Sequence, residues 1–248
     1  FMLKNYKHTV FACYIGYITQ AIANNFAPLL FITFNKSFNL PLSKVGLLVS
    51  INFFTQILVD AAASKFVDKI GYRAGIILSH VFTSIGLITM GILPYIISPY
   101  IGLCISVVLY AIGGGLSEVI VSPIVEACPG EEKEAAMSLL HSFYCWGCVA
   151  VVLLSTLCFK FFGINNWRWI SIGWSLIPIF NIFYFSIVPI NTLVDKEKQI
   201  STKKLLSSSF FWILILLMLC SGACEQAMSQ WASAFAESGL KINKTLGD

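Results

Sequence analysis

Long apolar stretches alternate with short polar ones along the whole 248-residue chain. Most of the apolar stretches reach the roughly 20 residues that a helix needs to cross a bilayer. Because backbone groups in lipid must satisfy one another's hydrogen bonds, we expect each stretch to be a membrane-spanning helix. The pattern predicts seven spans, at His8–Thr33, Leu42–Ala63, Ala74–Leu93, Pro99–Ala127, Ala136–Phe162, Trp169–Pro189 and Phe210–Ala236.

The composition agrees with this interpretation. Hydrophobic residues make up 57% of the chain and charged residues 11%, whereas an ordinary soluble domain carries about 25% charged residues. So few charges could hardly cover a surface that faces water. We therefore expect an all-α integral membrane protein rather than a soluble protein with a very apolar core.

One long polar stretch, Thr192–Ser209, divides the chain. It predicts three parts: a six-helix transmembrane bundle over residues 1–190, a cytoplasmic linker over 191–209, and a seventh helix with its following loop over 210–248. Only one span follows the linker, and the chain begins at Phe1. We therefore expect a partial chain, whose missing second helix bundle belongs to the same protein.

The charges of the loops predict an orientation. With the amino terminus in the cytoplasm, ten of the 16 basic residues fall in inside loops. Lysine and arginine favour the cytoplasmic side of a membrane. We expect a multi-pass protein of the cell (inner) membrane with its amino terminus in the cytoplasm. A seven-helix receptor would normally place that terminus outside.

The sequence offers no pattern for enzyme chemistry. Most of the eight cysteines lie inside apolar stretches, where they behave as small hydrophobic residues. Cys145 and Cys148 have the spacing of a redox motif but lie in a lipid-length helix. We expect no cofactor, no metal site and no catalytic residue, and the scattered basic residues do not predict nucleic-acid binding.

Polar side chains inside the predicted spans are the candidate functional residues, because ionisable groups in a membrane are costly and usually face a cavity. Glu118 lies near the middle of the fourth span, where it could take up and release a proton while binding hydroxyl groups. The alternative is a purely structural role, in which Glu118 pairs with His141 or with a backbone group. Gln20, Asn24 and Asn25 place amides in the first span, and these could bind a hydroxylated solute or bridge helices.

The fifth and seventh spans hold further candidates. His141 could line a substrate site or simply pack between helices. Glu225 and Gln226 put polar groups into the seventh span, and Trp231 could stack on a sugar ring or anchor the helix at the interface. Asp60, near the end of the second span, could brace the loop that follows it.

That loop carries a recognisable pattern. Residues 65–75 read Lys-Phe-Val-Asp-Lys-Ile-Gly-Tyr-Arg-Ala-Gly. The charges and glycine, at Asp68, Gly71 and Arg73, resemble the loop after the second helix of the major facilitator superfamily of transporters. Motifs along the rest of the chain resemble its fucose-permease-like sugar:proton symporter branch; they are Ala23-Asn24-Asn25, Gly113-Gly114-Gly115-Leu116-Ser117-Glu118, Ser122-Pro123, Leu140-His141-Ser142-Phe143-Tyr144 and Gly222-Ala223.

The resemblance implies secondary active transport by alternating access. In this interpretation a sugar or similar small polar solute enters with a proton, and Glu118 carries that proton. The loop with Asp68, Gly71 and Arg73 would act as a gate, although these charges could also be plain topology signals. One departure stands out: the branch has an aspartate in the first helix where this chain has Pro28. An exporter of drugs or metabolites on the same fold, or a non-transporting seven-helix protein, remains an alternative.

Overall fold

The described part of the chain is built from helices. The computed structural model describes residues 5–130, 133–191 and 202–247, apart from the side chains of Ser64, Lys65, Asp68, Thr202 and Lys203. Its longer helices are α1 (Tyr6–Asn25), α3 (Leu42–Ile70), α4 (Tyr72–Ile96), α5 (Pro99–Glu126), α6 (Lys133–Phe162), α8 (Leu176–Ile187) and α10 (Ser209–Ser238). The shorter ones are η1 (Pro28–Leu30), α2 (Phe31–Phe38), η2 (Ile164–Asn166), α7 (Trp167–Trp174), α9 (Thr202–Leu206) and α11 (Lys244–Gly247).

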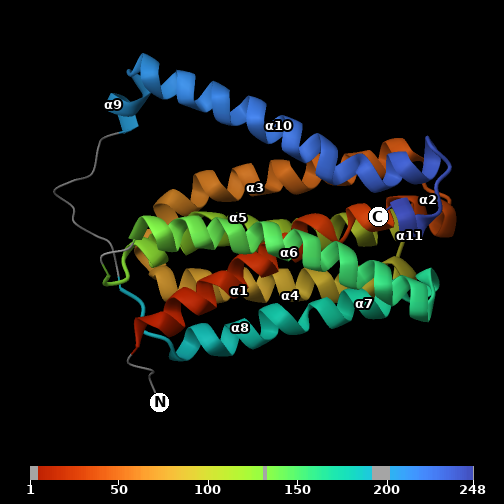
Figure 1. Cartoon of the computed structure of the whole chain (residues 1–248), viewed down its shortest axis with the longest axis horizontal. Coiled ribbons are helices and arrows are strands. Elements are labelled where there is room, and N and C mark those ends of the chain that lie inside the picture. The colour runs from red at the N-terminus through yellow and green to blue at the C-terminus, as the bar shows by residue number, and fades with distance from the viewer. Residues whose placement is uncertain (1–4, 131–132, 192–201, 248) are drawn as a thin grey trace.

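The helices α1 and α3–α8 run side by side as one bundle, and α10 lies along its edge (Figure 1). One end of the bundle carries α2 and α11, and we call it the α2 end. The opposite end carries α9 and the turn between α3 and α4, and we call it the α9 end. Most of the predicted linker, residues 192–201, lies outside the described residues.

Seven helical segments of the described chain are long and apolar enough to cross a membrane, as the sequence predicts. The first runs over Tyr6–Phe38, five residues past its predicted end at Thr33, because α2 continues it after a break at η1. The sixth covers Ile164–Ile187 and is broken at Ser175, between α7 and α8. Pro178 lies just after that break, and a proline cannot donate the backbone hydrogen bond that would continue the helix.

A single glycine separates α3 from α4. Gly71 has φ +85°, a conformation that side chains with a Cβ rarely adopt. Two residues later, Arg73 donates to the carbonyl oxygens of Phe185 and Val188, at 2.6 and 2.8 Å. Both carbonyls lie at the carboxyl end of α8, where helix carbonyls lack partners of their own. The loop is thereby attached to the last turn of α8.

Consecutive glycines of α5 bring two other helices close. A Cβ on Gly113 would lie 2.6 Å from the carbonyl oxygen of Ser79 on α4. A Cβ on Gly114 would lie 3.3 Å from Nε2 of Gln56, and one on Gly115 would lie 3.0 Å from Oδ1 of Asp60. Small residues allow close helix packing in membranes, so these glycines permit the close approach of α3 and α4 to α5.

The buried interior has two apolar regions with polar residues between them. One region lies toward the α2 end and includes Phe26, Phe34 and Trp167. The other lies toward the α9 end and includes Ile76 and Ile120. The boundary between them is the level at which polar side chains enter the bundle.

A buried histidine is part of this polar level. His80 is fully buried; its Nδ1 lies 2.8 Å from the carbonyl oxygen of Ile76, and its Nε2 lies 2.9 Å from Nδ2 of Asn181. Asn181 Nδ2 also donates to the carbonyl oxygen of Ala12, at 3.0 Å. These bonds fix the neutral tautomer with its proton on Nδ1, and they join α4, α8 and α1.

The seventh span, α10, contacts the bundle near the α2 end. Its buried residues are Gln230 and Ala234, both in its last third. Figure 1 shows the helix diverging from α3 toward α9 and converging with the bundle near α2. Most other side chains of α10 are exposed.

Candidate functional site

Glu118 on α5 and Gln20 on α1 form the centre of the candidate site. Gln20 Nε2 donates a hydrogen bond of 3.1 Å to Glu118 Oε2. The glutamate is exposed, so the carboxylate reaches an accessible surface of the bundle. Gln20 is only 6% exposed, and its Oε1 has no hydrogen-bond partner in the described structure. The pair therefore presents a carboxylate, which accepts bonds from hydroxyl donors, beside a buried amide oxygen that has no partner.

Aromatic and titratable side chains surround this pair. His141 on α6 is exposed and close enough for its charge to act on Glu118. The ring of Tyr17 lies 5.5 Å from the ring of His141, centroid to centroid, and its hydroxyl lies 3.0 Å from Oγ of Ser122. The structure thus brings together Gln20, Glu118 and His141, which the sequence analysis selected from three separate spans.

A second polar group lies one turn along α1, at Asn24. Gln56 Nε2 on α3 donates to Oδ1 of Asn24 at 2.9 Å and to Oδ1 of Asn52 at 3.1 Å. All three amides are buried. Asn52 and Gln56 were not among the predicted site residues. Their spacing of four residues in an apolar span does indicate that both amides lie on one face of the helix.

The proline in the first span has a direct structural consequence here. Pro28 has no backbone N–H, so it cannot donate to the carbonyl oxygen of Asn24 four residues earlier. Gln230 Nε2 on α10 donates to that oxygen at 2.9 Å. The break in the first span therefore supplies the acceptor that binds the seventh span. Sequence reasoning missed Gln230, which follows Gln226 by one helical turn.

The remaining candidates have mixed surroundings. Asn25 donates to the carbonyl oxygen of Ala21 and to Sγ of Cys148, so it bridges α1 and α6. Gln226 is half-buried and accepts from Ser229 on its own helix. Glu225 is exposed on α10, and its charge acts on Tyr144 and Cys148 of α6.

Trp231 packs at the α2 end of the bundle. Its ring centroid lies 5.3 Å from that of Phe31, and a Cβ on Gly46 would lie 3.3 Å from the indole. The ring therefore fills a contact between α10, α2 and α3. A sugar-stacking role for Trp231 stays a prediction.

Asp60 on α3 faces the bundle. Its Oδ1 is buried without a hydrogen-bond partner in the described structure and lies against Gly115 of α5. A role for Asp60 as a brace for the following loop stays a prediction. Asp60 also lies about one turn from Glu118, since Gly115 precedes Glu118 by three residues.

The gating role of the loop also stays a prediction. Gly71 forms the turn, and Arg73 bonds to α8 within the same bundle. The side chain of Asp68 lies outside the described residues.

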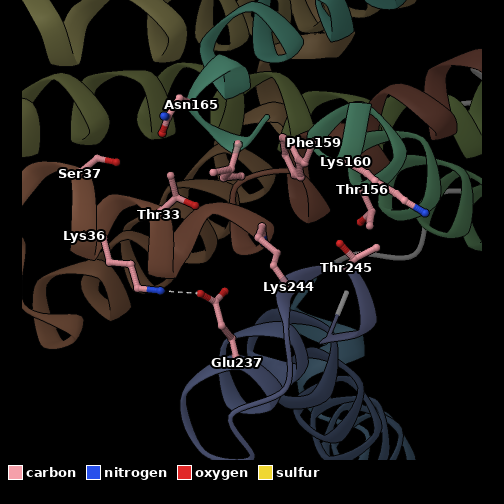
Figure 2. A pocket seen from close by; sticks show the side chains of 11 residues that line it. Thr33, Lys36, Ser37, Thr156, Phe159, Lys160, Asn165, Glu237, Lys244 and Thr245 are labelled. Carbon is pink, nitrogen blue, oxygen red and sulfur yellow. Dashed lines mark hydrogen bonds and ion pairs between the residues drawn. The ribbon is translucent and has the colours of Figure 1, made fainter. Parts of the chain in front are cut away.

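At the α2 end, an ion pair joins the bundle to α10. Lys36 Nζ on α2 lies 2.9 Å from Oε1 of Glu237. Lys244 on α11 donates to the carbonyl oxygen of Leu29 and lies over the ring of Phe159. These residues line a cavity of about 350 Å³ (Figure 2), which contains none of the predicted site residues. In the described residues, no cluster of three histidine, cysteine or acidic side chains could hold a metal ion.

The chain is similar to known transporters in sequence and in fold. The family model described as Major Facilitator Superfamily matches residues 13–247. A crystal structure of a D-xylose-proton symporter superposes with a TM-score of 0.74 at 13% sequence identity. The superposition covers 97% of this chain and 64% of that one, so the chain spans less than two thirds of the symporter. No curated protein sequence matches it.

The family match covers almost the whole chain, and the superposition shows the same helical fold. The expected fold class, an all-α multi-pass membrane protein with part of the major facilitator fold, is confirmed. The comparisons point to a transporter rather than an enzyme. This protein belongs to the major facilitator superfamily.

Proposed function

We propose that this chain is part of a proton-coupled carrier for a sugar or a similar small polar solute. The observation that carries the proposal is the Glu118–Gln20 pair, an acid at membrane level bonded to an amide whose oxygen is unpartnered. A solute hydroxyl can donate to the exposed carboxylate. The structural neighbour is named a D-xylose-proton symporter, which supports the same class of solute and the same coupling ion.

Glu118 suits a proton carrier because Gln20 can stabilise both of its protonation states. The ionised carboxylate accepts from the amide N–H. A protonated carboxyl group would donate to the amide oxygen after the amide turns over, since amides offer both a donor and an acceptor. An acid in lipid would be costly in either case, so its accessible side would face a cavity rather than the bilayer.

The arrangement of α10 supports alternating access. Contacts from Gln230, Trp231 and Glu237 join α10 to the bundle near the α2 end. The cavity between Asn24, Asn52 and Gln230 measures only about 10 Å³, far too small for a sugar. With the amino terminus in the cytoplasm, this conformation would be closed outside and open inside. Breaking the contacts at the α2 end would permit the opposite state.

One observation argues against the alternative function, an exporter of drugs or metabolites. It would be favoured by first-span amides that face lipid. Gln20, Asn24 and Asn25 are all buried in the bundle. Polar groups turned inward suit a polar solute better than an apolar drug.

The proposal is tested by uptake into vesicles that contain the complete protein carrying this chain. Labelled hexoses and deoxyhexoses would be screened with and without an inward proton gradient. We expect gradient-driven uptake of at least one sugar, lost in Glu118→Gln and kept in Glu134→Gln, which removes an exposed acid from the first turn of α6. Uptake that ignores both the gradient and Glu118→Gln would refute proton coupling. No uptake of any sugar would refute the solute class.

A further inference from the structure

Asp60 is a second acid inside the bundle, and the proposed function has not yet used it. It lies on α3, one turn after Gln56 and three residues before the end of the second span at Ala63. Its Oδ1 has no accessible surface and no hydrogen-bond partner in the described structure. An ionised carboxylate with a buried, unpaired oxygen is strongly unfavourable. A proton on Asp60 would remove this cost, which makes the residue a candidate proton carrier.

Asp60 and Glu118 belong to one polar strip between α3 and α5. Asp60 Oδ1 lies 3.0 Å from the position of a Cβ on Gly115, and Glu118 is one helical turn further along α5. Their separation is short enough for the charge of Glu118 to act on that of Asp60. Two carboxyl groups this close do not ionise independently, so the first proton that binds is shared between them.

Among the side chains that the structure describes around the pair, we find no permanent positive charge. Gln20 and Tyr17 on α1 are neutral, as is Gln56 on α3. His141 on α6 acts on Glu118 and is the titratable base nearby. Among the side chains that the structure describes, no lysine or arginine forms a salt bridge with either carboxylate. A proton can neutralise the second charge.

We propose that Asp60 is a second proton-carrying residue of the transport cycle and that it shares one proton with Glu118. In the step that loads solute, the O–H bond of the Glu118 carboxyl group breaks and an O–H bond forms on Asp60, directly or through one water. The negative charge moves to Glu118, which then accepts from Gln20 and from a solute hydroxyl. The inference rests on the proposed proton coupling.

The test compares Asp60→Asn with the wild type in vesicles that contain the complete protein. Asparagine has the shape of aspartate, so the contact with Gly115 is kept. Exchange of labelled sugar at equal pH needs alternating access alone, whereas accumulation needs coupling. An inward gradient of one pH unit can drive about tenfold accumulation with one proton per sugar. We expect Asp60→Asn to exchange sugar, to show no accumulation, and to lose the proton influx that a pH-sensitive dye reports. Glu134→Gln should retain all three activities.

Accumulation and proton influx at wild-type levels in Asp60→Asn would overturn the inference while leaving the proposed function intact. A wild type that exchanges sugar but ignores the gradient would instead refute the coupling itself, and the inference with it. If Asp60→Asn fails to fold, carbodiimide labelling of the wild type decides the matter, because this reagent modifies protonated carboxyl groups. We expect one modification per molecule, divided between Asp60 and Glu118 and reduced by sugar. Labelling of Glu118 with none on Asp60 would overturn the shared proton.

Discussion

The contact between α4 and α5 at Gly113 allows a quantitative prediction for Gly113→Ala. The new Cβ would lie 2.6 Å from the carbonyl oxygen of Ser79 and 2.7 Å from the amide nitrogen of Thr83. Ordinary contact for a Cβ begins at 3.4 Å. These two neighbours are backbone atoms, which cannot move aside as a flexible side chain can, and Oγ1 of Thr83 would lie closer still. The two helices must therefore separate by about 0.8 Å at this point, the difference between 3.4 and 2.6 Å.

The free-energy cost follows from that displacement. Overpacking of this kind costs about 1–3 kcal/mol. Ser79 Oγ donates to the carbonyl oxygen of Gly113 at 2.7 Å, and a separation of the helices would break this bond. An interhelical hydrogen bond in a membrane contributes about 0.6 kcal/mol. Alanine favours the helix over glycine by about 1 kcal/mol, which offsets part of this cost. We therefore expect Gly113→Ala to lower the free energy of unfolding by roughly 1–3 kcal/mol, which lowers the folded-to-unfolded ratio by about fivefold or more.

Unfolding in mixed micelles, followed as the fraction of sodium dodecyl sulfate rises, measures this difference. Gly222→Ala is the matched control, because a Cβ on Gly222 would meet no atom within 4 Å. Alanine favours helices over glycine by about 1 kcal/mol, so the control should be as stable as the wild type or more stable. Equal unfolding midpoints for Gly113→Ala and Gly222→Ala would show that the close contact does not limit stability.

Three further predictions concern contacts across helices. Lys36→Glu should place two acids together and open the α2 end, so that a cysteine introduced at this end reacts faster with a maleimide. The double variant that also carries Glu237→Lys should react slowly again. An unchanged rate in the single variant would contradict the role of the ion pair. Asn181→Leu removes the donor to two buried acceptors, on α1 and α4, and should lower the free energy of unfolding by about 1–3 kcal/mol, measured in the same micelles. Gln230→Leu should lower the yield of disulfide cross-linking between α10 and α1, whereas Met228→Leu, at an exposed position, should not; equal yields would refute the anchoring bond.

The sequence was sufficient to predict the spans, because bilayer length imposes a strong pattern. The pattern of Asp68, Gly71 and Arg73 also indicated the loop between the second and third spans, where Gly71 forms the turn. The first span extends five residues beyond the predicted end at Thr33, because Lys36 lies on α2, where it binds Glu237, and does not interrupt the helix.

It was harder to predict which neighbouring helix each side chain faces. A helix surrounded by lipid and other helices is apolar on every side, so hydropathy does not indicate which face turns inward. The bond between Gln20 and Glu118 joins residues 98 positions apart, and no local pattern encodes it. The turn of Asp60 toward Gly115 likewise depends on how α3 packs on α5. Asn52, Gln56 and Asp60 share a spacing of four residues, which indicates a common face without showing which helix that face meets.

The one-sided attachment of α10 gives that helix the mechanics of a lever. With Gln230 as the pivot, the arm to Ser209 spans 21 residues, or about 32 Å, and the arm to Glu237 spans seven residues, or about 10 Å. A shift of about 1 Å at the Lys36–Glu237 ion pair would therefore move the other end of a rigid α10 by about 3 Å. Because the arm to Glu237 is the shorter one, a small displacement at the ion pair becomes a larger displacement at Ser209.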